Sequence, residues 1–152
     1  MRFGGDNEMR LESLNSILKL KGWKKDQIET EITSIQRVIN DHEERLRMME
    51  SEFALHLDEF RDRHKSDVLR PDLLRSFHAY MEGMNERMGR ERESIFKRLQ
   101  ELKDKREKLV SVYKEKMVVE KLRERHISEE VRADKRVQRK ELDFISLRRH
   151  KR

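Results

Sequence analysis

The chain has 152 residues, of which 45% are charged and 34% hydrophobic, and its net charge is +6. Typical globular domains are about 45–50% apolar and about 25% charged, so this chain is too polar for a thick multilayer core. One proline and five glycines offer too few turn signals for a many-stranded fold, and zero cysteine excludes disulfides, cysteine-ligated zinc and thiol catalysis. A disordered chain or a thin helical assembly remains.

The first long segment carries the periodicity of a coiled coil. An apolar residue recurs every seven positions from Leu11 to Phe60, with Lys25 as the only interruption. A second series starts three residues later, at Leu14, and four of its seven positions are apolar. Disorder predicts no such sustained alternation of three- and four-residue spacings. The pattern therefore predicts a helix over about 8–65.

The periodic pattern stops just before the single proline, Pro71. Proline lacks a backbone N–H and pushes the preceding residue, Arg70, out of helical geometry. These effects predict a hinge over about 66–72. Pro71 could also occupy the first turn of a following helix, where its missing N–H costs little.

A second periodic segment follows the hinge. The seven-residue series resumes at Leu74 and continues to Leu109, with all six positions apolar. Its companion series fails at Glu91 and Arg98, and from Ile95 onward Leu99 and Tyr113 supply seam positions at a four-residue offset. Such a drift in phase is a stutter in a coiled coil. We predict a second helix over about 72–147.

The heptad phases of the two segments match in an antiparallel hairpin closed at the hinge. The facing pairs include Phe60 with Phe77, Ile35 with Leu102, and Leu11 with His126. We therefore predict an all-α fold in which two long helices form one antiparallel coiled-coil hairpin over residues 1–152, monomeric on its own. Residues 128–152 find no partner in this register, so the C-terminal helix should overhang.

The positive charge lies in that overhang. Residues 1–120 contain 25 Lys and Arg and 25 Asp and Glu, whereas residues 121–152 contain 12 and six. Acidic residues are interleaved with the basic ones, and Phe144 is the only aromatic residue available for base stacking. These features argue against a nucleic-acid partner. They favour a protein partner, with a merely solvated tail as the remaining alternative.

The sequence contains no recognisable catalytic or cofactor-binding arrangement. His42-Glu43-Glu44 begins like a zinc-protease motif but lacks the second histidine. His42 and His56 occupy the heptad seam, where a polar residue can specify register. The sequence has neither an N-terminal signal-like run nor a long apolar stretch, so we expect a cytoplasmic, non-enzymatic protein with no cofactor, no metal and no membrane insertion.

Several segments resemble the flagellar export protein FliJ family and its virulence-type relatives, the YscO-like stalk proteins. One feature of the resemblance is a phenylalanine-rich approach to a short hinge that contains proline. The others are Arg10-Leu11-Glu12-Ser13-Leu14, Phe77-His78-Ala79-Tyr80-Met81 and Arg139-Lys140-Glu141-Leu142-Asp143-Phe144-Ile145.

The resemblance implies a non-enzymatic stalk of the flagellar type III export apparatus, peripheral at the inner membrane. Such a stalk would link the hexameric export ATPase to the cytoplasmic domain of the membrane export gate, promote ATPase assembly, and handle export chaperones. Carried over to this chain, the gate contact would involve His42, Leu46, Met49, Phe53, Tyr80 and Met84. The ATPase contact would involve Leu11, Leu14, Arg132, Arg136, Arg139, Lys140, Arg148 and Arg149.

Three other functions remain open from the sequence. The first is a virulence-type secretion stalk of the YscO-like kind. The second is a basic coiled coil that binds nucleic acid, whose affinity should fall steeply with salt. The third is a structural rod that self-associates as a long dimer.

Overall fold

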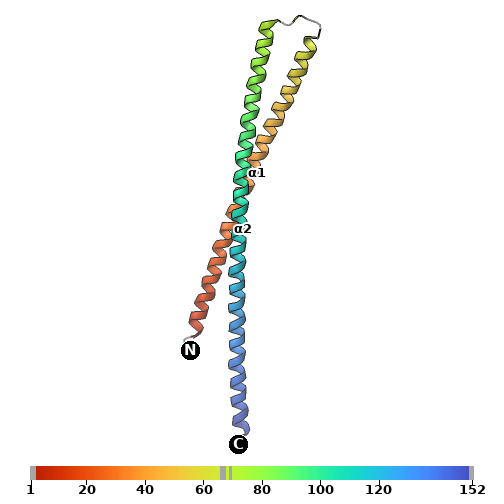
Figure 1. The fold of residues 1–152 in the computed structure, drawn as a ribbon. Coiled ribbons are helices and arrows are strands. Elements are labelled where there is room, and N and C mark those ends of the chain that lie inside the picture. The colour runs from red at the N-terminus through yellow and green to blue at the C-terminus, as the bar shows by residue number, and fades with distance from the viewer. Residues whose placement is uncertain (1–2, 66–67, 69, 151–152) are drawn as a thin grey trace. The chain divides into compact units, whose positions relative to one another are not determined.

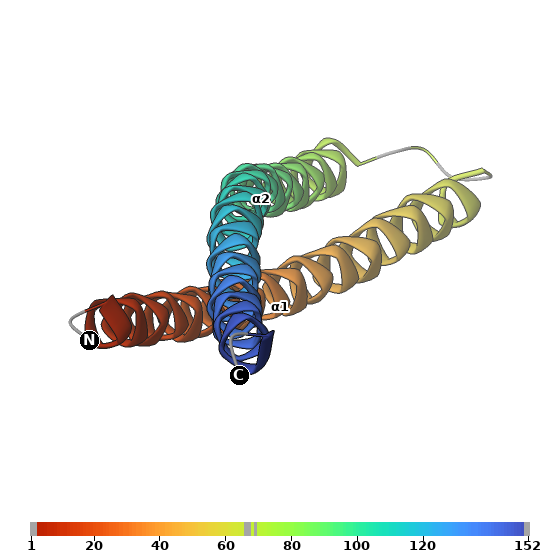
Figure 2. The same ribbon diagram turned by 90° about the horizontal axis from the view of Figure 1, so that it is seen from below.

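A computed structural model describes residues 3–65, 68 and 70–150. It contains two helices, α1 over Phe3–Arg63 and α2 over Pro71–His150 (Figure 1). Figure 2 shows each of them as one continuous helix. The predicted all-α fold is confirmed: two long helices pack against each other, consistent with a hairpin.

Helix α1 begins earlier than the predicted start near residue 8. Its first turn contains Asp6, and its last turn contains Arg61 and Arg63. Acidic residues at the N-terminus and basic residues at the C-terminus both stabilise the helix dipole. Heptad periodicity could not mark the first turns because they precede the first apolar repeat, at Leu11.

Helix α2 begins at Pro71, so the proline occupies the first helical position. The N–H of Leu74 donates to the carbonyl of Arg70 at 3.1 Å, which closes the first turn. Within the predicted hinge, Ser66, Asp67 and Leu69 lie outside the described residues, as do Lys151 and Arg152 at the end of the basic tail.

The chain divides into two compact units, each containing parts of both helices. The hinge-side unit is Ile28–Lys108, and the terminal unit is Met1–Gln27 together with Leu109–Arg152. Most of the core lies in the hinge-side unit. The buried apolar side chains in the described part of the chain are Ile28, Ile35, Ile39, Met81, Met84, Met88, Leu102 and Val112.

Two predicted facing pairs of the hinge-side unit are confirmed. Phe60 and Phe77 stack with ring centroids 3.7 Å apart and planes inclined by 10°. Ile35 and Leu102 share one buried cluster with Ile39. The register inferred from the heptad phases therefore holds at these two pairs. The predicted seam position of Leu99 is wrong, because its side chain is 46% exposed.

In the terminal unit, one predicted seam residue is wrong. Val112 is buried with 3% exposure, whereas Tyr113 is 42% exposed. Leu109 and Val112 are three residues apart, which continues the ordinary alternation of the seam. Tyr113 instead lies beside the seam, where the Lys25 ammonium sits 5.4 Å from its ring centroid.

The last described part of α2 is exposed along its whole length. Every residue from 131 to 150 is exposed, whereas Glu130 is still partly covered. No helix in the described part of the chain is both long and apolar enough to span a bilayer.

Candidate partner-binding sites

We use "hinge-side surface" for the six residues predicted to contact an export gate: His42, Leu46, Met49, Phe53, Tyr80 and Met84. All six lie in the hinge-side unit. The four on α1 are half-buried, Tyr80 is 42% exposed and Met84 only 5% exposed. Met84 therefore contributes mainly to the core, and Tyr80 offers the most surface to a partner. The contact itself stays a prediction.

His42 forms a polar bridge across the seam. Its Nδ1 lies 2.5 Å from Oε2 of Glu91 on α2, and Nε of Arg45 donates to Oε1 of the same carboxylate at 3.3 Å. The hydrogen bond from His42 lowers the pKa of Glu91; partial burial opposes this effect, and the positive charge of Arg45 reinforces it. The companion heptad series therefore fails at Glu91 because this position forms a polar pairing with His42 instead of an apolar contact.

Replacing Glu91 with glutamine should lower the free energy of unfolding by about 1–2 kcal/mol at neutral pH, because a half-buried charged hydrogen bond is lost. The pKa of Glu91 is lower in the folded chain than its usual 4.5. Its contribution is therefore fully present above the unfolded pKa and is lost as the pH falls through the folded pKa. The difference from wild type should shrink on acidification in urea titrations.

Glu93→Gln is the matched control, because its side chain is 65% exposed and pairs only with the neighbouring Lys97. This change should shift stability by less than about 0.5 kcal/mol. A Glu91→Gln difference that stays constant from neutral to acidic pH would contradict the proposed role of the carboxylate.

Tyr80 is fixed in place by two contacts from α1. Its hydroxyl donates to Oε1 of Glu52 at 3.2 Å, and its ring meets His56 edge to face with centroids 5.2 Å apart. Partial burial and the Glu52 carboxylate raise the pKa of Tyr80. The exposed part of the ring is a preordered aromatic surface.

An aromatic groove of about 340 Å³ lies beside Tyr80, near the hinge. Phe60 stacks on His64 with ring centroids 4.3 Å apart, and it also stacks on Phe77. Leu73, 51% exposed, also lines the groove. Heptad periodicity placed Phe60 and Phe77 in the seam, but it could not show that they border an open groove.

We use "terminal surface" for the residues predicted to contact an ATPase: Leu11, Leu14, Arg132, Arg136, Arg139, Lys140, Arg148 and Arg149. All lie in the terminal unit. Leu11 and Leu14 are half-buried, whereas the six basic residues are all exposed. The structure thus leaves the cationic part of this surface accessible, and the contact stays a prediction.

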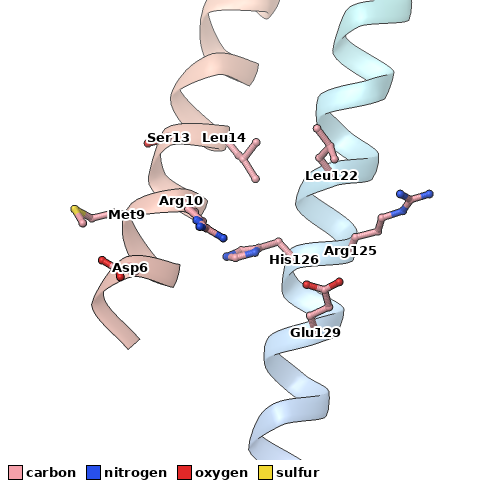
Figure 3. Close-up of a pocket in the computed structure, with 9 residues that line it drawn as sticks. All are labelled: Asp6, Met9, Arg10, Ser13, Leu14, Leu122, Arg125, His126 and Glu129. Atoms are coloured by element: carbon pink, nitrogen blue, oxygen red, sulfur yellow. The ribbon is translucent and has the colours of Figure 1, made fainter. Parts of the chain in front are cut away.

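A groove of about 720 Å³ opens between the two helices of the terminal unit. Figure 3 shows Leu14 pointing from α1 toward α2, and His126 pointing from α2 toward α1. Nε2 of His126 donates to the carbonyl of Asn7 at 3.1 Å. The predicted facing residue, Leu11, lies one helical turn further along α1, and its pairing with His126 stays a prediction.

The sequence interpretation missed this groove. Its lining includes Leu122, which is 48% exposed, and Met9, which is 62% exposed. Leu122 and His126 are four residues apart on one helix face. That spacing was a usable signal, but it could not show that the helices leave space between them.

Lys21 occupies a seam position that heptad rules assign to an apolar residue. Its ammonium pairs with the Glu115 carboxylate on α2. This hydrogen bond and the lysine charge lower the pKa of Glu115. A charged pair across the seam thus replaces apolar packing at this point of the terminal unit.

The described residues contain no cluster of three or more His, Cys, Asp or Glu side chains able to hold a metal ion. A protein-family model described as Flagellar FliJ protein matches residues 9–152. The chain belongs to the FliJ family. Comparisons with curated proteins and with solved structures gave no match.

Membership of the FliJ family identifies the chain as a stalk component of the flagellar type III export apparatus. The family is a non-enzymatic, cytoplasmic component of that apparatus, and it implies association with the export ATPase. The flagellar assignment agrees with the first interpretation of the sequence, rather than with the virulence-type alternative.

Proposed function

We propose that this chain couples the hexameric export ATPase to the cytoplasmic domain of the membrane export gate. The observation that carries the proposal is the exposed C-terminal part of α2. Residues 131–150 are all exposed and contain seven Lys and Arg against three Asp and Glu. An isolated helix of this length is marginal in water, so a partner would stabilise it.

The terminal surface is the proposed ATPase contact. Val137, Phe144 and Leu147 are each more than half exposed, which gives the basic helix apolar contact area. Leu11 and Leu14 lie in the N-terminal part of α1, in the same unit. Ordering of this helix by the ring would promote ring assembly, since the ring gains contacts that its free subunits lack.

The hinge-side surface is the proposed gate contact. Tyr80, ordered by Glu52 and His56, presents an aromatic face, and aromatic anchors dominate the energetics of many interfaces. We place the handling of export chaperones at the same apparatus, on the cytoplasmic side of the inner membrane. The chain would act there as a monomeric hairpin.

The test of the ATPase contact measures ATP hydrolysis by the cognate export ATPase with and without the full chain, alongside sedimentation. We expect stimulation accompanied by a shift of the ATPase toward hexamers. Unchanged hydrolysis together with no co-sedimentation would remove the ATPase role.

The gate contact is tested in the same preparation with the purified cytoplasmic domain of the gate. Tyr80→Ala should weaken its binding about tenfold, as expected for an aromatic anchor, and leave ATPase stimulation unchanged. Phe96→Ala is the control, because Phe96 is a 62% exposed aromatic residue of the same unit outside the hinge-side surface. Equal losses in both variants would show that Tyr80 is no anchor.

A further inference from the structure

One face of α2 carries a row of basic side chains that the proposed coupling does not fully use. The "basic row" consists of Lys121, Arg125, Arg132, Lys135, Arg136 and Arg139. These residues are spaced by three, four and seven positions, so they share one helix face. At 1.5 Å per residue the row is about 27 Å long. All six side chains are exposed, and Figure 3 shows Arg125 pointing away from α1.

The helix separates charges that the sequence interleaves. Asp134 and Glu141 lie on the opposite side of α2 from the row, by the 3.6-residue period. Glu124 and Glu129 border the row on its two sides, and Asp143 follows its end. None of the six basic residues forms an ion pair with any residue that the structure describes. Acidic residues interleaved along the sequence argued against a polyanionic partner. On this face of the helix that argument is weaker.

We infer that the basic row binds the headgroups of anionic phospholipids. Between residues 121 and 139, this face holds six cations and Ser128, with no apolar or aromatic residue. Protein interfaces combine arginine with apolar and aromatic anchors, and this face offers the arginines without those anchors. A flat anionic surface, by contrast, can engage every cation of a straight row at once, without such anchors.

Nucleic acid fits the row less well than a lipid surface does. Single strands bind on stacking platforms of aromatic residues, and the row has none. The backbone of a duplex winds around its axis, so a straight row of this length meets its phosphates over only part of its extent.

The lipid contact goes beyond the proposed coupling and does not depend on it. Arg132, Arg136 and Arg139 belong to both the basic row and the terminal surface, so binding to lipid and binding to the ATPase are alternative states of α2. A vesicle assay contains no ATPase. Its result therefore stands whether or not the ATPase proposal survives.

The experiment is co-sedimentation of the full chain with vesicles of phosphatidylcholine containing about 30% phosphatidylglycerol, and with phosphatidylcholine alone. Each Lys or Arg near an anionic surface strengthens binding about fivefold, so Arg132→Gln/Arg136→Gln/Arg139→Gln should bind about 100-fold more weakly. The control Arg37→Gln/Arg75→Gln/Arg90→Gln lowers the net charge from +6 to +3 as well, but on exposed residues outside the row.

The inference is supported if the wild type prefers the anionic vesicles, raised salt abolishes the preference, and only the row variant loses binding. Equal losses in both variants would overturn it, because net charge alone would then explain binding. Absence of binding to anionic vesicles would overturn it too, as would tighter binding to an RNA or DNA duplex at the same salt. Circular dichroism checks that both variants retain wild-type helicity.

Discussion

Replacing Leu102 with alanine is expected to lower the free energy of unfolding by about 2–4 kcal/mol. Leu102 is 6% exposed and packs with Ile35 and Ile39 in the buried cluster of the hinge-side unit. The truncation removes apolar burial and leaves a cavity that the surrounding side chains fill only in part. In a domain of this size the Tm should fall by about 5–15 °C.

Leu142→Ala is the matched control for this prediction. The same chemical change is made in the same helix, but Leu142 is 66% exposed. Its effect should stay below about 0.5 kcal/mol. Urea titration and thermal melting followed by circular dichroism measure both variants. Similar shifts for the two leucines would contradict the position of the core described above.

Removing residues 131–152 is expected to abolish stimulation of the export ATPase while the remaining chain stays folded. The described residues of this segment are all exposed, so their loss removes no packing from either unit. The segment also carries all six basic residues of the terminal surface. We expect stimulation to fall at least about tenfold, as when several interface anchors are lost together.

The truncated chain needs two comparisons. Circular dichroism melting should show the same cooperative transition as the full chain, and a collapse of cooperativity would show that residues 131–150 pack on the rest. A full-length chain in which residues 131–152 are shuffled keeps the charge but not its pattern. Full stimulation by the shuffled chain would mean that charge alone suffices, and full stimulation by the truncated chain would place the ATPase contact elsewhere.

Hydrophobic periodicity was enough to predict the two helices and the pairing in the hinge-side unit. Burial of an apolar row every seven residues requires a partner helix of matching phase, and a short break allows only an antiparallel neighbour. Phe60 therefore had to meet Phe77 once the hinge was located near Pro71. The family resemblance, in turn, rested on short segments and was confirmed by a match over residues 9–152.

The polar contacts and the accessible surfaces required the tertiary structure. Periodicity marked Glu91 as a defect, but only the structure placed it 2.5 Å from His42. Only the structure, likewise, buried Val112 and exposed Tyr113. The physical reason is that the burial of apolar residues depends on their regular spacing in the sequence. The partner of a charged or aromatic side chain depends on its reach and direction, which are set by the neighbouring helix.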